Sequence, residues 1–302
     1  MLSRYTQRNL TWIDLVHPST AEVKQLMDEF HLDPLIADEL LAPSFKPKVE
    51  RRGDAIYVIL HFPAPRVTGQ RPEQEIDFVI GKDFLITTRY DHIDPLHAFA
   101  KAFEVQAVLG RGHAVHGGHL FAALTHDIYQ SLINECDTLR HKLGAIEDRI
   151  FNGNERSMVI ALSDIGRVIH DFRQALLPHR EMLNSLEPAA VRMFDQGFSY
   201  WVREVIGSYE RVTDTLEHLR DALHELRDTN DSLLNTKQNE IMTTFTVLSF
   251  IFFPLSFIAG LFGMNTLHNP FVGHQYDFWI VLGIMATVAV GCFAYFKAKN
   301  WL

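Results

Sequence analysis

Two long runs of apolar residues without a charge stand out near the C-terminal end of the sequence. They cover Thr244–Phe262 and Phe278–Phe296. At a rise of 1.5 Å per residue, about twenty such residues cross a hydrocarbon core of roughly 30 Å. The pattern therefore predicts a transmembrane domain of two helices over residues 244–302, joined by a short loop.

Three successive stretches before these runs carry apolar residues at alternating spacings of three and four. This spacing predicts long helices that pack lengthwise as a coiled coil, so residues 119–243 are expected to form a helical bundle and stalk. We expect the second helix to continue past Pro178 and to end at Pro188. The third series meets no helix breaker before the first apolar run, which predicts one continuous helix over 200–262, about 95 Å long. The three series are Leu132, Cys136, Leu139, Leu143, Ile146 and Ile150; Met158, Leu162, Ile165, Ile169, Phe172 and Leu176; and Val205, Tyr209, Val212, Leu216, Leu219, Leu223, Leu226 and Leu233.

The first 118 residues alternate strand-like and helix-like segments. Runs of β-branched and aromatic residues predict strands, and apolar residues at three- and four-residue spacing predict helices. The strands are predicted at Trp12–Leu15, Ala55–Phe62, Glu75–Ile80 and Phe84–Thr88. The helices are predicted from Ser19 or Thr20, from Asp33 to Leu41, and over Asp94–Leu109. This order predicts an α+β domain over residues 1–118, with a mixed sheet covered by helices.

Three histidines follow the last of these helices at intervals of three residues. His113, His116 and His119 lie in a Gly-rich break. Histidines at this spacing could bind zinc if the segment were ordered suitably. A solvated polar loop is the interpretation we favour, and the zinc site stays open as its alternative.

Charge and composition narrow the compartment and the partners. The formal net charge of −9 argues against a nucleic-acid partner. Lys237, Lys297 and Lys299 flank the apolar runs on one side and the connecting loop has no Lys or Arg, which predicts that both chain termini are cytoplasmic. No signal peptide is recognised, and Cys136 and Cys292 predict no disulfide framework. Since no nucleophile–base pair, phosphate loop or zinc-helix motif occurs, we expect neither an enzyme nor a bound cofactor.

A stripe of residues at helical spacing runs along the first apolar run and the segment just before it. Two spans cannot enclose a water-filled path, so transport would require an oligomer in which one helix per subunit faces the axis. The stripe suits a narrow pore with polar rings and hydrophobic constrictions, but small residues also favour helix–helix contacts. By spacing alone both interpretations stay open. The stripe comprises Asn239, Met242, Phe245 or Thr246, Ser249, Phe253, Ser256 and Gly260.

Gly263-Met264-Asn265, directly after the first of two final spans, resembles the signature of the CorA family of divalent metal cation transporters. The surrounding residues extend the resemblance over essentially the whole chain. The matching segments are Lys46–Glu50, Tyr200–Val205, Asn239–Met242, Pro254–Asn265 and Tyr295–Leu302.

The resemblance implies a funnel-shaped homopentamer with an α+β cytoplasmic domain, a long coiled-coil stalk helix and two transmembrane helices. Gly263, Met264 and Asn265 would form the selectivity filter, because five neutral amide oxygens can hydrogen-bond a hydrated ion without holding it too tightly. The pore-lining residues would be Asn239 at the cytoplasmic entry, Met242, Phe245, Ser249, Phe253, Ser256 as a second polar ring, and Gly260. Phe245 and Phe253 depart from the family, which often has Met and Leu at the gate.

Regulation in the family comes from divalent ions held by carboxylates between subunits. Glu204 matches the stalk acid of that site, and Asp228 or Asp231 could ring the funnel beside it. The alternative for all three is a solvated surface acid.

These observations predict a channel or transporter of the inner membrane that passes hydrated Mg²⁺, or Co²⁺, Ni²⁺ or Zn²⁺, with itself, lipid and divalent cations as partners. The loop Thr266–Pro270 lacks the acid that magnesium-transporting members commonly carry, and His268 and His274 would favour softer ions. A zinc-selective member and a poorly conducting membrane scaffold or sensor therefore remain alternatives.

Overall fold

The computed structural model describes residues 1–44, 46–64, 73–90, 94–109, 115–194, 196–264, 276–299 and 301. The chain divides into two compact units, residues 1–227 and 228–302. One helix, α7, belongs to both units, because it runs without interruption from Phe198 to Phe262.

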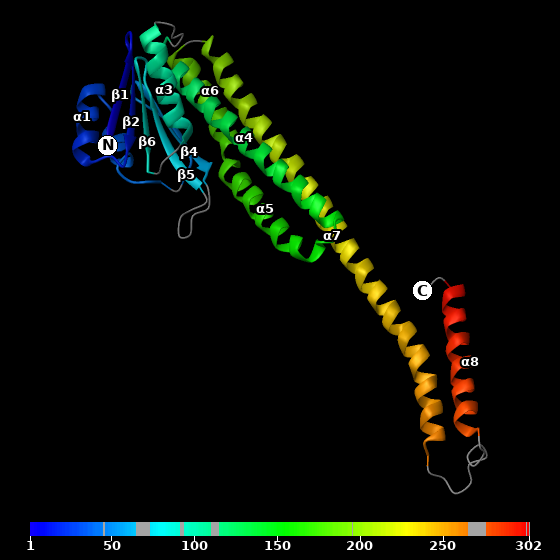
Figure 1. The fold of residues 1–302 in the computed structure, drawn as a ribbon. Coiled ribbons are helices and arrows are strands. Elements are labelled where there is room, and N and C mark those ends of the chain that lie inside the picture. Colours follow the sequence, from blue (N-terminus) through cyan, green and yellow to red (C-terminus); the bar gives the residue numbers. More distant parts are fainter. Residues whose placement is uncertain are drawn as a thin grey trace. The chain divides into compact units, whose positions relative to one another are not determined.

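The first unit is built around a six-stranded mixed sheet (Figure 1). Its strand order is β1-β2-β6-β5-β4-β3, and only β2 and β6 pair in parallel. The strands are β1 (Leu2–Gln7), β2 (Leu10–Val16), β3 (Lys48–Arg52), β4 (Ala55–Pro63), β5 (Glu73–Ile80) and β6 (Phe84–Arg89). The four predicted strands are confirmed as β2, β4, β5 and β6.

Helices α1 (Thr20–Phe30) and α2 (Pro34–Glu39) cover one face of the sheet. Ser19 caps α1 in a capping box with Glu22, and Asp33 caps α2, as the sequence predicts. Apolar side chains from both helices pack on every second residue of β2, β4, β5 and β6. This core comprises Ile13, Leu15, Val23, Leu26, Ile36, Ala37, Tyr57, Ile59, Val79 and Ile86, together with Leu32, Leu40 and Ala55.

The opposite face of the sheet is covered by α3 (Asp94–Leu109) and α4 (Gly117–Phe151) through aromatic contacts. The Trp12 ring lies 5.3 Å from that of Phe99 on α3, and Phe78 meets Phe121 of α4 edge-to-face at 5.1 Å. The first unit is therefore a three-layer α/β/α domain, and the expected cover by Asp94–Leu109 is confirmed.

Helices α4, α5 (Glu155–Leu176) and α7 carry the three heptad series. All the apolar residues of these series are buried except Leu233, which is partly exposed. The lengthwise packing is confirmed, and so is the single helix that continues from the soluble unit into the first apolar run.

The predicted course of the second helix is wrong. It ends at Leu176, and a separate helix α6 runs from His179 to Met193 with Pro188 inside it. Pro178 has no N–H to continue the helical ladder, and proline is well suited to a helix start. The break matters below, because it places His179 at the N-terminus of α6.

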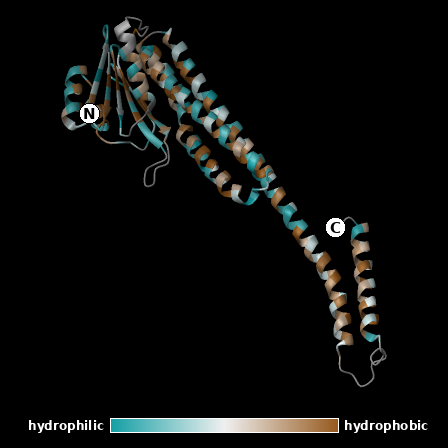
Figure 2. Cartoon of the chain, viewed as in Figure 1, coloured by the Kyte–Doolittle hydropathy of each residue, from teal (hydrophilic) through white to brown (hydrophobic). Residues whose placement is uncertain are grey.

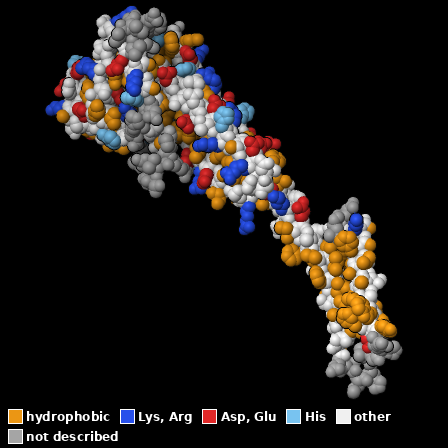
Figure 3. Space-filling view, in the orientation of Figure 1, with side chains coloured by type: hydrophobic (Ala, Val, Ile, Leu, Met, Phe, Trp, Pro, Cys, Tyr) orange, Lys and Arg blue, Asp and Glu red, His pale blue; other side chains and the backbone are white. Residues whose placement is uncertain are grey.

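The second unit comprises the C-terminal part of α7 and helix α8 (Asp277–Ala298). Both helices are long and apolar enough to cross a membrane. Figure 2 shows the hydrophobic colouring that fills both, and Figure 3 shows apolar side chains gathered on their outer surface. Within the single chain most of these apolar side chains are exposed.

The start of α4 approaches the β5–β6 turn so closely that only glycine fits there. Gly117 donates to the Lys82 carbonyl at 2.8 Å, and a Cβ on Gly117 would lie 2.1 Å from the carbonyl oxygen of Phe84. We expect Gly117→Ala to lower the free energy of unfolding by about 1–3 kcal/mol, because backbone must move. Gly144→Ala in the same helix is the control, since nothing lies within 4 Å of its Cβ, and it should be neutral or stabilising by up to about 1 kcal/mol. Chemical denaturation of the two variants measures the difference, and equal stabilities would contradict the close-approach argument.

Candidate functional site: the α7 stripe and the stalk acids

The predicted pore-lining residues share one exposed face of α7. We call this face the α7 stripe; its members are Asn239, Met242, Phe245, Ser249, Phe253, Ser256 and Gly260, all exposed in the single chain. Buried or partly covered positions recur on the other side of the helix, at Thr243, Val247, Ile251, Pro254, Leu255 and Ile258, whereas Thr246, beside the stripe, is also partly covered. At 100° per residue these positions are centred roughly 160° from the stripe. The stripe is therefore free of α8 within one chain and available to face an axis or another subunit.

Hydroxyl groups on and beside the stripe give their protons to the helix backbone. Ser249 Oγ donates to the Phe245 carbonyl at 2.8 Å, and Thr246 Oγ1 donates to that of Met242 at 2.8 Å. The oxygen lone pairs are then left for another donor, such as a water molecule of a hydrated cation. Such a ring could accept hydrogen bonds from passing waters without carrying a charge.

The two large aromatic side chains of the stripe point away from the protein. Phe245 is 65% exposed and Phe253 is 77% exposed. Both rings are apolar, and they share a face of the helix with the polar residues Asn239, Ser249 and Ser256. If this face lined a pore, each ring would form a hydrophobic constriction between polar positions.

Pro254 interrupts the backbone ladder of α7 in the middle of the span. Because proline has no N–H, the carbonyl of Phe250 loses its intrahelical donor. Cys292 Sγ of α8 lies 4.0 Å from this carbonyl oxygen and is its donor. In a hydrocarbon environment a freed carbonyl needs such a partner, so the contact joins the two spans at the proline.

The tip of α7 is described only in part. The helix ends at Phe262; Gly263 donates to the Ala259 carbonyl at 2.9 Å, and Met264 is 56% exposed. A Cβ on Gly263 would lie 3.0 Å from the same oxygen, so the glycine is favoured by close approach, and its φ is not in the left-handed region. Asn265, with His268 and His274, lies outside the described residues.

Glu204 lies at the rim of a small hollow of about 190 Å³ between α4 and α7. Its side chain is exposed, and its neighbour Arg203 pairs with Glu187 at 3.1 Å. The hollow is lined by Ala122, Ala123, His126, Asp127, Trp201, Glu204 and Val205.

Two further titratable groups in this hollow were not predicted. Burial raises the pKa of Asp127, although the nearby His126 charge opposes the shift. Ser208 Oγ donates to the Glu204 carbonyl at 3.0 Å and accepts from Arg211 at 2.9 Å, so His126 Nδ1, 2.9 Å away, is a donor. Sequence spacing could not pair α4 with α7, which are about 80 residues apart.

Among the described residues, no group of three or more His, Cys, Asp or Glu side chains is arranged to hold a metal ion within one chain. Asp228 and Asp231 are exposed on α7. A divalent ion at Glu204 or Asp228 would therefore need ligands from water or a second subunit.

The histidine-rich segment is not the solvated loop that the sequence favours, at least over its described part. His116 stands at the N-cap position of α4, and His119 lies in the first turn of the helix. Their rings are 3.9 Å apart, and His116 stacks on Phe194 at 4.1 Å. Phe198 meets both rings edge-to-face. The two histidines pack as aromatic groups between α4 and α7, and His113 lies outside the described residues.

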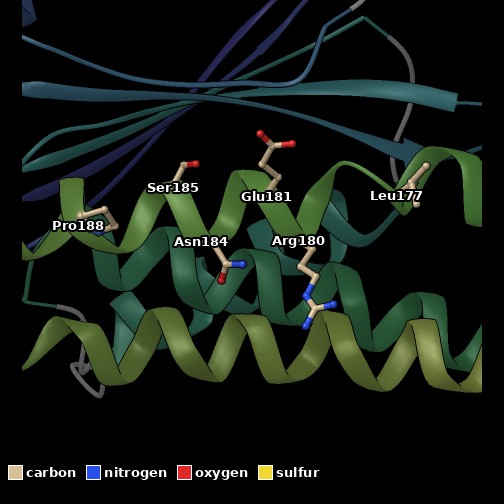
Figure 4. A pocket seen from close by; sticks show the side chains of 6 residues that line it. All are labelled: Leu177, Arg180, Glu181, Asn184, Ser185 and Pro188. Carbon is tan, nitrogen blue, oxygen red and sulfur yellow. The ribbon is translucent and has the colours of Figure 1, made fainter.

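A second, open hollow of about 670 Å³ lies along α6 (Figure 4). Its polar side chains do not converge: Arg180 and Asn184 point to one side of the helix, whereas Glu181 and Ser185 point to the other. We assign it no binding role.

Comparison with known proteins agrees with this architecture. The profile of the family described as CorA-like Mg²⁺ transporter protein matches residues 7–298. The chain is 24% identical to the cobalt/magnesium transport protein CorA of Thermotoga maritima over 97% of this chain and 83% of that protein. It is 23% identical to the protein of the same description from Methanocaldococcus jannaschii, over 97% of this chain and 92% of that one.

The fold is also similar to a solved structure. The complete structure of the CorA magnesium transporter from Methanocaldococcus jannaschii superposes with a TM-score of 0.83 at 21% sequence identity, covering 97% of this chain and 92% of that one. An α/β domain, a long helix and two candidate transmembrane helices are thus shared over nearly the full length.

Proposed function

Since the chain belongs to the CorA-like Mg²⁺ transporter family, we propose that it carries divalent cations across a membrane through a pore lined by the α7 stripe. The observation that carries the proposal is the stripe itself, because its polar and aromatic side chains lie together on the face of α7 that α8 leaves uncovered. Five copies around an axis would place these side chains in successive rings, as in the funnel that the family implies.

Each ring has a role that follows from its chemistry. Asn265 would accept the ion in its hydration shell at the outer mouth, with Gly263 and Met264 shaping the turn. In the closed state, Phe253 and Phe245 would exclude water, and with it the hydrated ion, from the pore. Asn239 would contact the ion at the cytoplasmic end. Mg²⁺ holds its waters tightly, so neutral oxygens that hydrogen-bond those waters suit it better than carboxylates that replace them.

We place the protein in the bacterial-type inner membrane with both termini in the cytoplasm. Lys237, Lys297 and Lys299 lie at one end of the two spans, as the positive-inside rule requires for that orientation. Cytoplasmic divalent ions would act on the soluble unit, where Glu204, His126 and Asp127 share a hollow, with Asp228 further along α7.

Uptake into liposomes by wild type and Asn265→Ala tests the filter. Wild type should take up one or more of Mg²⁺, Co²⁺, Ni²⁺ and Zn²⁺, and the panel identifies the ion. Asn265→Ala should lower uptake about tenfold or more, which corresponds to losing ~1.4 kcal/mol of stabilisation of the passing ion. Asn269→Ala, in the same connecting segment, should leave uptake unchanged. No flux of any of these ions by wild type would refute the transport function and leave the scaffold alternative; uptake of Zn²⁺ alone would establish the zinc-selective one.

The aromatic constriction is tested by Phe253→Ala. Removing the ring should widen the proposed pore at this position. The initial uptake rate should then rise about five- to tenfold, which is equivalent to lowering the barrier by ~1–1.4 kcal/mol. Phe250→Ala is the matched control, because Phe250 lies on the α8 side of the helix, 6.0 Å from the Phe296 ring. Equal rates in Phe253→Ala and wild type would show that this ring does not limit passage.

Regulation at the stalk is tested by limited proteolysis of the full-length protein. Millimolar Mg²⁺ should protect wild type, and Glu204→Ala should need several-fold more Mg²⁺ for the same protection, because one carboxylate ligand is lost. Glu210→Ala removes an exposed acid from the same helix and should behave as wild type. Unchanged protection in Glu204→Ala would exclude Glu204 as a ligand.

A further inference from the structure

A line of buried polar side chains crosses the soluble unit from one face of the sheet to the helices on the other. Its members, which we call the polar line, are Asp77, Glu75, His61, His179 and Tyr129, and all are less than 10% exposed. Buried polar groups of this kind are expensive unless they are paired, so their arrangement defines one state of the structure.

The sheet end of the polar line is formed by facing residues of β4 and β5. His61 Nε2 lies 3.0 Å from Glu75 Oε2 and 3.0 Å from the Ser44 carbonyl, which are both acceptors, so this nitrogen carries a proton. Asp77 accepts from Tyr57 Oη at 3.2 Å. Burial raises the pKa of Asp77 well above its usual value, and the Glu75 charge adds to the shift.

The middle of the polar line is a single hydrogen bond between the sheet and α6. His179 Nε2 donates to the backbone carbonyl of His61 at 2.8 Å. The pairing between β3 and β4 ends at Ile59, so His179 supplies the partner of a β4 carbonyl beyond the last β3 residue. The break in the helix at Pro178 is what brings His179 to this position.

The other ring nitrogen of His179 reaches α4. In the neutral ring Nε2 donates and Nδ1 is the acceptor, so Nδ1 accepts a hydrogen bond from Tyr129 Oη at 2.7 Å. The ring also stacks near Tyr209 of α7, with centroids 6.1 Å apart, and meets Phe62 of β4 edge-to-face at 5.0 Å. One neutral imidazole therefore joins β4, α4 and α7.

This arrangement fits only the neutral form of His179. A second proton on Nδ1 would have to displace the Tyr129 proton, which would lose its acceptor inside the core. The groups that face the ring are Tyr129 from α4, Tyr209 from α7 and His61 from β4, and none of them is an anion at neutral pH; Arg180, the next residue, adds positive charge near Tyr209. Burial lowers the pKa of His179 to about 4, with the His61 charge acting in the same direction and its carbonyl in the opposite one.

We propose that His179 is a proton-sensitive latch, which holds stalk helix α7 and strand β4 together while it is neutral and releases them when it binds a proton. Any effect of the latch on ion transport rests on the proposed function, whereas the latch itself does not. Since α7 is one helix from Phe198 to Phe262, loosening at Tyr209 would act on the same element that carries the α7 stripe.

The sign of the pH dependence separates His179 from the rest of the polar line. A base with a lowered pKa stabilises the closed form above about pH 6.5, and this stabilisation is lost as the pH falls toward 4. Burial lowers the pKa of His61, but its hydrogen bonds to Glu75 and to the Ser44 carbonyl outweigh burial and raise the pKa overall. Burial raises the pKa of Asp77. Protonation in acid therefore stabilises the closed form at these two residues. Loosening in acid is therefore the signature of His179 within the polar line.

Hydrogen–deuterium exchange of the full-length protein in lipid nanodiscs tests the latch. Between pH 7.5 and 5.0, after correction for chemical exchange, opening at peptides covering residues 56–63 and 203–214 should rise about 30-fold, the ratio given by pKa values of 6.5 open and 4 closed. His179→Gln keeps a donor and an acceptor but cannot titrate, so its rise should fall to within about threefold. His218→Gln, which changes an exposed histidine of α7, should keep the wild-type rise.

A second variant protects the test against misfolding of the first. Tyr129→Phe removes the hydroxyl that donates to His179 Nδ1 but leaves His179 titratable. Hydrogen exchange at pH 7.5 should therefore increase, and the further increase of exchange at pH 5.0 should persist. A wild-type rise retained in His179→Gln, or no rise in wild type at 203–214, would overturn the latch. Ion uptake measured in parallel decides a different question, because absent uptake contradicts the proposed function and not the exchange result.

Discussion

The structure depends on the continuity of one helix, α7, which runs from Phe198 to Phe262 and lacks a backbone donor only at Pro254. Such a helix needs no turn, loop or hinge residue between the part that packs against α4 and α5 and the part that is apolar on all sides. In water, a helix is held mainly by its packed face, and in a membrane mainly by its own satisfied backbone. The same element meets both requirements, because its heptad series ends at Leu233 and its charge-free run begins further along the helix, at Thr244.

The sequence carries most of this architecture, because the strongest signals are long and periodic. The heptad series, the two charge-free runs and the four inner strands are each read correctly from spacing alone. Strands β1 and β3 were not predicted, and both lie at the edges of the sheet. β3 is KVERR, with four charged residues in five, so it lacks the apolar pattern of a strand. The turn from β1 to β2 passes through Arg8 with φ 54° in place of an Asn-Gly pair, so it lacks the usual hairpin signal. The helix break at Pro178 was not predicted, because the apolar spacing continues across it.

The α7 stripe could be predicted from the sequence, whereas the contacts between distant elements of the soluble unit could not. The α7 stripe follows from helical spacing within one element, and its exposure on one face agrees with that spacing. The neighbours of Glu204 and the partners of His179 come from elements about 50 to 120 residues away, and no local pattern reports such encounters. The histidines at 116 and 119 show the same limit, since three-residue spacing does not tell a metal ligand from an aromatic ring packed beside Phe194.

The parallel pairing of β2 with β6 bears on how the protein is made. β2 ends at Val16 and its central neighbour β6 ends at Arg89, so 73 residues separate the two. At a synthesis rate of about 5–20 residues per second, β2 waits roughly 4–15 s for that neighbour. During this interval the hairpin with β1 is the strand pairing open to it, and Trp12, which ends up fully buried, lacks its contact with Phe99 of α3. The nascent chain therefore passes through a stage in which β2 is an open edge, and a chaperone that covers such edges would bind within the first twenty residues.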